Sequence, residues 1–239
     1  MIVAARLFKA CVLTAIFSLA SQAHAQALDI APISETLDSN QRVASFTLTN
    51  RSDKATEVQI RPYKWVQNNA RDELTLTTDL MVSPPFATIA PGQSQTIRMQ
   101  VASNTTAQEK AFRIVFDQLP ATDAKDIQLT FSLIVPVFVK APSGTQPPLE
   151  WMLQRRGDQL LLTTTNQGAH HLRLTNLKLI DSQGESFKIH SNTLPYLLAG
   201  SEGQWVVSDP AHSLRNGMKL LLTTGDHIET HDTWLTLIP

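Results

Sequence analysis

Short runs of alternating apolar and polar residues recur along most of the chain, and stretches with helical periodicity are almost absent. In Arg42–Asn50, for example, Ala44, Phe46 and Leu48 lie on one face of an extended strand, and mostly hydroxylated residues lie on the other. Pro, Gly, Asn and Asp separate these runs, as they do in proteins built from short strands. The pattern predicts an all-β fold.

The expected strands fall into two series, which indicate two domains. Seven strands between Leu28 and Val139 have the number and spacing of an immunoglobulin-like β-sandwich. A proline-rich stretch with Gly and Ser follows, which favours a semi-rigid hinge. A second series of strand candidates then begins. We therefore predict an N-terminal domain at 26–141, a hinge at 142–148 and a C-terminal β-sandwich at 149–239.

The first 25 residues have the three parts of a secretory signal peptide. Arg6 and Lys9 form a basic region, Ala10–Ala20 is uncharged and apolar, and Ala23-His24-Ala25 is a small-x-small cleavage site. The apolar run is shorter than the roughly 20 residues that cross a bilayer. We predict export and cleavage after Ala25. The mature chain then contains no cysteine, because Cys11 lies in the removed segment.

Charge and motifs argue against several classes of function. The chain has 20 basic and 21 acidic residues, and removal of Arg6 and Lys9 leaves 18 and 21, a net charge of −3. No basic patch for nucleic acid, no glycine motif for a nucleotide and no serine-nucleophile motif is present. His227 and His231 have a spacing that suits zinc on a helix, but their surroundings predict a loop. We therefore expect no enzyme activity, no metal and no other cofactor.

The longest alternating run is Ile127–Val139, which extends over about 43 Å at ~3.3 Å per residue, well beyond an ordinary strand. One of its faces is entirely apolar, and no charge lies between Asp126 and Lys140. Two interpretations are open. The run is either an ordinary long core strand or an uncharged strand edge that is lent to an incomplete partner.

Three stretches resemble the periplasmic chaperones of chaperone–usher pilus systems, the PapD-like family. They are Leu80–Met99, with its Pro-Pro and Pro-Gly pairs, Phe112–Pro120, and the strand that ends in Val135–Lys140. The last stretch is most similar to the archaic branch of the family. The resemblance implies two immunoglobulin-like domains in an L-shaped arrangement and a periplasmic location. It also implies two kinds of partner, pilus subunits and an outer-membrane usher.

The resemblance also implies a mechanism, in which the chaperone inserts alternating apolar side chains into the open groove of a pilus subunit. Here the role falls to a set of side chains that we call the donor set: Ile127, Leu129, Phe131, Leu133 and Val135. The rest of the run, around Pro136–Val139, is expected to pack into the domain junction. Whether the free protein covers this edge by self-association is left open.

The anchor for the subunit's C-terminal carboxylate departs from the family pattern. The better-known branches use an Arg on the first strand and a Lys on the last. Here Leu28–Ile33 has no Arg, and the Lys position falls on or near Pro136. Because a carboxylate needs fixed cationic donors, we expect the anchor to be Arg98, Arg113 or Lys140. Arg98 is the first candidate because it interrupts an otherwise uncharged strand.

A structural or adhesive surface protein, such as a pilin, is the main alternative. A pilin would carry an exposed N-terminal extension and a single incomplete sandwich. This chain begins a strand soon after the expected cleavage site and is expected to contain two complete domains, which favours the chaperone.

Overall fold

The computed structural model describes residues 28–102, 107–120, 129–190, 195–209, 212–225 and 230–239. Every regular element in these ranges is a β-strand, which confirms the expected all-β fold. Within the same ranges, none of the chain forms a helix with the length and apolar character that a membrane span requires. The expected signal peptide, residues 1–25, lies outside the described residues.

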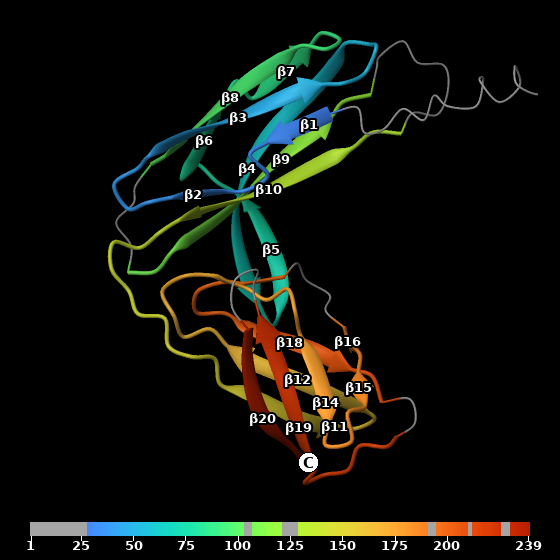
Figure 1. The fold of residues 1–239 in the computed structure, drawn as a ribbon. Helices are drawn as coiled ribbons and strands as arrows, with labels where there is room; N and C mark the ends of the chain where they lie inside the picture. The colour runs from blue at the N-terminus through green and yellow to red at the C-terminus, as the bar shows by residue number, and fades with distance from the viewer. Residues whose placement is uncertain (1–27, 103–106, 121–128, 191–194, 210–211, 226–229) are drawn as a thin grey trace, which may run out of the picture.

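The N-terminal domain is a sandwich of two sheets, seen in the upper half of Figure 1. The first, which we call the β8 sheet, has the order β1 (Leu28–Ala31), β3 (Val43–Asn50), β8 (Ser94–Val101) and β6 (Leu80–Ser83). The second, the β10 sheet, has the order β2 (Glu35–Leu37), β10 (Ser132–Val139), β9 (Lys110–Gln118), β4 (Thr56–Asn68) and β5 (Arg71–Leu76), with β7 (Phe86–Ile89) also beside β4. Neighbouring strands are antiparallel except for β2 and β10, which run parallel.

At two places, prolines mark where the chain passes from one sheet to the other. The run Leu80–Ile89 becomes β6 in the β8 sheet and β7 in the β10 sheet, because Pro84 and Pro85 have no N–H group with which to continue a ladder. The first strand likewise ends at Ala31 before Pro32, and the chain re-enters the other sheet as β2. The prolines therefore pass the chain from one sheet to the other.

Alternating residues of both sheets form the core of the N-terminal domain. Phe46 of β3 and Phe116 of β9 meet edge to face, with ring centroids 6.0 Å apart. The other buried apolar side chains of this core come from all of the longer strands: Leu28, Leu37, Leu48, Val58, Ile60, Leu80, Ile89, Ile97, Met99, Val101, Phe112, Ile114, Val135, Val137 and Val139.

The C-terminal domain is built around a separate core. Its main sheet has the order β15 (Ser186–Phe187), β14 (Lys178–Asp181), β19 (Lys219–Gly225), β20 (Thr230–Ile238), β11 (Trp151–Arg156), β12 (Gln159–Thr165), β18 (Glu202–Val207) and β16 (Ile189–His190). Strands β13 (Leu172–Arg173) and β17 (Tyr196–Leu197) form a further pair. The core of this domain includes Leu153, Leu162, Leu179, Trp205, Leu220, Leu222 and Leu237.

A hairpin of the N-terminal domain extends beyond its sandwich toward the C-terminal domain (Figure 1). It consists of the second half of β4 and the whole of β5. Asn69 and Ala70 join the two strands, and both have positive φ, as a tight two-residue hairpin turn requires. Pro62 lies where the neighbour of β4 changes from β7 to β5, so its missing N–H interrupts neither ladder. The chain can therefore carry one continuous strand from the first sandwich to the second domain.

Replacement of Phe46 by Ala should destabilise the N-terminal domain by about 3–5 kcal/mol, because it removes a fully buried ring and leaves a cavity. Val43→Ala is the matched control on the same strand, since Val43 is 54% exposed and a surface change there costs about 0.5 kcal/mol or less. Denaturant unfolding followed by tryptophan fluorescence measures both. Equal loss of stability in the two variants would contradict this description of the core.

Candidate functional site

The strand β10 is paired on one side along its whole length and on the other side only at its end. Its ladder with β9 runs from Ser132, opposite Asp117, to Val139. On the other side, β2 pairs only with Val137–Val139. Within the residues that the structure describes, the edge of β10 from Ser132 to Val135 therefore has no strand beside it. Such an edge presents free backbone N–H and C=O groups to another chain.

The donor set becomes steadily more buried along the strand. Leu129 is 81% exposed, Phe131 is 39% exposed, Leu133 packs partly against the core, and Val135 is only 2% exposed. Val135 lies opposite Ile114 and belongs to the N-terminal core. It is therefore not available to a partner in this structure, because its face of the strand is already covered by the other sheet. Ile127 lies outside the described residues.

A groove of about 580 Å³ opens next to this edge, between β10 and β1. Apolar side chains of both strands and of the loop after β1 line it, including Leu28, Ile30, Ile33, Leu133 and Val135. The groove therefore lies where the two sheets of the N-terminal sandwich separate, and the free edge of β10 forms one of its walls. A second strand that paired with β10 would cover this groove.

The opposite face of β10 carries a polar network at the start of the strand. Ser132 donates a hydrogen bond to Oδ1 of Asp117, the residue directly opposite on β9. Arg61 of β4 binds the other oxygen of this carboxylate through Nη2 at 2.6 Å and Nε at 3.2 Å. Burial acts to raise the pKa of Asp117, but the bonds from Ser132 and Arg61 outweigh it and hold this pKa below its ordinary value. The three strands are thereby linked through one carboxylate.

Arg113 lies on the same face of the β10 sheet, opposite Pro136 in the ladder. Its guanidinium is buried: Nη2 donates to Asp72 at 2.6 Å, and Cζ lies 3.8 Å from the centre of the Trp65 ring. Among the described residues, no hydrogen-bond acceptor is paired with Nε of Arg113, which is itself buried. The cation is thus held by one carboxylate and one aromatic ring.

The other two expected anchor residues lie elsewhere. Arg98 is on β8, between Ser45 and Ser83, and so belongs to the opposite sheet from β10. Lys140 follows β10 and pairs with Asp38 at 3.0 Å on the surface. Arg98 therefore does not share a sheet with the edge of β10, and its role as an anchor stays a prediction. Arg61, which the sequence analysis does not single out, alternates in phase with Tyr63 and Trp65 along β4.

The far end of β10 reaches the junction between the domains through Phe138, one of the residues expected to pack there. The Phe138 ring stacks on His171 with centroids 3.6 Å apart, and it also contacts Trp65 and Tyr196. Phe138 is buried in a small apolar cluster that includes Trp65 and Leu198. Its neighbours Val137 and Val139 instead face the N-terminal core. β10 thus contributes to the N-terminal core and to the domain junction near its end, and it has a free edge at its start.

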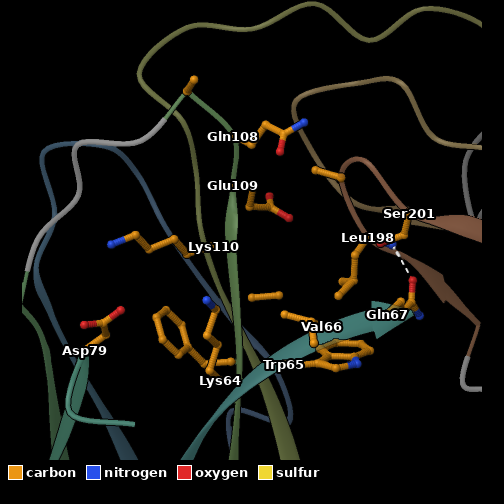
Figure 2. A pocket seen from close by; sticks show the side chains of 14 residues that line it. Lys64, Trp65, Val66, Gln67, Asp79, Gln108, Glu109, Lys110, Leu198 and Ser201 are labelled. Atoms are coloured by element: carbon orange, nitrogen blue, oxygen red, sulfur yellow. Dashed lines mark hydrogen bonds between the residues drawn. The ribbon is translucent and has the colours of Figure 1, made fainter. Parts of the chain in front are cut away.

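Polar groups hold the same junction from two sides. The carboxylate of Glu109 is 2% exposed and accepts hydrogen bonds from the backbone N–H of His171 at 3.0 Å and from its ring at 2.7 Å. Gln67 donates to the Tyr196 carbonyl and accepts from the Leu198 N–H, both at 2.9 Å. Figure 2 shows this last bond beside a pocket of about 680 Å³ that both domains line.

No metal centre is found among the described residues: they contain no group of three or more His, Cys, Asp or Glu side chains placed to hold an ion. His231 lies in β20, and His227 lies outside the described residues. The expectation of a loop is therefore wrong for His231, which belongs to a strand.

The comparison with protein families identifies a class of protein that assembles surface fibres. A family profile described as "Pili and flagellar-assembly chaperone, PapD N-terminal domain" matches residues 28–146. The chain belongs to this PapD-like family of pilus-assembly chaperones, which work in the periplasm. The family is one of chaperones, and the match gives no support to the alternative of a pilin.

Solved structures share the fold across both domains. One is from the CsuC–CsuE chaperone–tip adhesion subunit complex of the archaic Csu pili of Acinetobacter baumannii, with 18% identity and a TM-score of 0.65 over 90% of this chain and 100% of that chain. Another is the YadV chaperone, with 17% identity and a TM-score of 0.64 over 88% and 100%. A third is from the SafA pilin–SafB chaperone complex of Salmonella enterica, with 11% identity and a TM-score of 0.60 over 86% and 95%. No curated protein matches the chain by sequence.

The pKa of Asp117, followed by carboxyl NMR, should lie below its ordinary value and should rise in Ser132→Ala, which removes one bond to the charged form. Because this pKa is lowered in the folded protein, the network contributes stability at neutral pH that is lost as the pH falls through the lowered pKa. Asp209 is the internal control. Burial acts to raise its pKa, but hydrogen bonds from Leu214 and Ser213 lower it, and none of them involves Ser132. An unchanged Asp117 pKa in Ser132→Ala would contradict the network.

Proposed function

We propose that this chaperone holds pilus subunits by donating the strand edge that begins before β10, and then delivers them to an outer-membrane usher. The observation that carries the proposal is the exposure of Leu129 and Phe131 immediately before the unpaired edge Ser132–Val135. Two of the structural neighbours come from complexes of a chaperone with a pilin or a tip adhesion subunit, which supports this choice of partner.

Such an edge supplies both affinity and specificity. Its backbone groups can pair with a strand of the subunit, while alternate side chains enter pockets of the subunit. Full burial of Leu129 and Phe131 would contribute about 1.5–3 kcal/mol each, and Leu133 would add a smaller amount because it is already partly covered. This gross gain is reduced by the cost of ordering the two partners. The interaction needs no covalent chemistry and can be reversed when another strand takes its place.

The carboxylate at the subunit's C-terminus would be bound on the outer face of the β10 sheet. Arg61 and Arg113 both lie on this face, two rows apart in the ladder between β4 and β9. The Arg61 side chain is 41% exposed, whereas that of Arg113 is 7% exposed. We therefore assign the first contact with an incoming carboxylate to Arg61, with Arg113 as the buried cation behind it.

Export and self-association complete the proposal. Residues 1–25 would act as a signal peptide that is removed after Ala25, which accounts for work in the periplasm. In the absence of a subunit, the apolar edge formed by Leu129, Phe131 and Leu133 would be covered by a second copy of the chain, because an exposed edge of this kind promotes association.

Phe131→Asp should abolish subunit capture while the fold is retained, because a charge at a central contact costs more than 2 kcal/mol, or at least about 30-fold in affinity. Co-expression with a pilus subunit from the same gene cluster, followed by isolation of the complex, measures capture. Ile238→Asp is the control, since Ile238 is also 39% exposed but lies on the C-terminal domain. Circular dichroism checks the fold. If Phe131→Asp unfolds, the run is core, and if it captures normally, the donor edge lies elsewhere.

Arg61→Gln should weaken the binding of the intact subunit by about tenfold, because one cationic partner of the carboxylate is lost. The loss should be clearly smaller for a subunit whose C-terminus is amidated, since that subunit has no carboxylate to bind. Arg156→Gln, an exposed arginine of the C-terminal domain, is the control. Titration of purified chaperone with both subunit forms measures the difference. Equal losses for the two forms would show that Arg61 is not the anchor.

A further inference from the structure

The polar network at the start of β10 lies where the strand leaves the sheet. Upstream of Ser132, the described contact of the chain with β9 is a single backbone hydrogen bond, from the Gln118 N–H to the Phe131 carbonyl at 2.9 Å. Leu129 and Thr130 precede it and are exposed. The bond between Ser132 and Asp117 is therefore the outermost side-chain contact that ties β10 to its neighbour.

This contact lies in a register-determining position. Ser132 and Asp117 are directly opposite in the ladder, and the bond joins their side chains on one face. In a β-strand, a slip of one residue turns every side chain to the other face. Leu129 and Phe131 have the opposite parity to Ser132, so a fixed Ser132 determines the face on which both apolar side chains stand.

The carboxylate that holds Ser132 is itself held. Both oxygens of Asp117 are used, one by Ser132 and the other by the two nitrogens of Arg61. The side chain of Asp117 is 19% exposed, and Arg61 comes from the next strand of the sheet. Because Arg61 fixes the carboxylate of Asp117 from the side of β4, Ser132 has a single acceptor in a fixed position. No such contact supports the other side of β10 among the described residues, because β2 begins its pairing only at Val137.

We propose that Asp117 and Ser132 are positioning residues for subunit capture, which fix the register at which the donated edge leaves the sheet so that Leu129 and Phe131 face the subunit. The inference rests on the proposed function, since it concerns the same edge. A polar pair on the outer face thus helps to place apolar side chains on the inner face. Neither residue needs to touch the subunit.

Ser132→Ala tests this role, because it removes only the donor of the bond. We expect subunit capture to fall about tenfold and amide hydrogen exchange at Leu133 of the free protein, which pairs with β9, to become faster. The midpoint of global thermal unfolding should fall only slightly, because one exposed hydrogen bond is lost. Ser132→Thr keeps a hydroxyl group and should restore both capture and protection. The probe is the pilus subunit encoded beside this protein's gene, diluted from denaturant into a solution of the chaperone.

The C-terminal domain offers a matched control. Thr223 donates to Asp232 at 2.7 Å, and the two residues are likewise directly opposite in an antiparallel ladder. Thr223→Ala therefore removes the same kind of bond at a distant place and should change neither capture nor exchange at Leu133. If Thr223→Ala lowers capture as much as Ser132→Ala does, the effect is general destabilisation and the positioning role is wrong.

The outcomes separate the two proposals. If the unmodified protein captures the subunit and Ser132→Ala captures it equally well, the positioning role is wrong and the proposed function stands. If the unmodified protein captures no subunit, the proposed function fails, and the positioning role fails with it. Reduced capture by Ser132→Ala with unchanged exchange at Leu133 would also overturn the inference, because the loss would then not arise from the register of β10.

Discussion

The ladder between β9 and β10 is the interaction on which the rest of the structure depends. It gives β10 two constrained faces and one free edge at the same time. One face delivers Val135, Val137 and Val139 to the core of the N-terminal domain, and the other delivers Phe138 to the junction with the C-terminal domain. Because both faces are committed at the end of the strand, only its beginning can be offered to a partner. The division between covered and uncovered residues is therefore a division along one strand, and the proposed function falls to the uncovered part.

Much of this organisation could be predicted because it is local in the sequence. Alternation over short distances identifies strands and faces, and the proline-rich stretch after β10 separates two series of strands. The same local pattern also places Phe138 on the opposite face from the valines around it. What alternation does not reveal is where a strand stops being covered by its neighbours. For this reason Val135 was grouped with Leu129 and Phe131, although the β8 sheet already covers it.

The cationic side of the site was harder to predict, because its contacts join distant parts of the chain. Arg61 and Asp117 are 56 residues apart, and Arg113 and Asp72 are 41 residues apart. Nothing in the local pattern indicates that β4 and β9 are neighbours, or that β8, with Arg98, lies in the other sheet. Pairing between strands decides which charges share a face. Local alternation therefore does not show that Arg61 and Arg113 share a face of one sheet while Arg98 belongs to the other.

The continuity of β4 has a mechanical consequence. Two contacts of β4 lie on one face of the same strand. Arg61 binds the carboxylate of Asp117 near the free edge of β10, and Trp65 packs in the domain junction. The two residues are four positions apart, about 13 Å at ~3.3 Å per residue. A strand is stiff along its axis over such a distance, and Pro62 between them removes further backbone freedom. Motion between the domains would then reach the carboxylate of Asp117 directly through β4. On the proposed function, a force on the C-terminal domain is transmitted along this strand to the edge that holds the subunit.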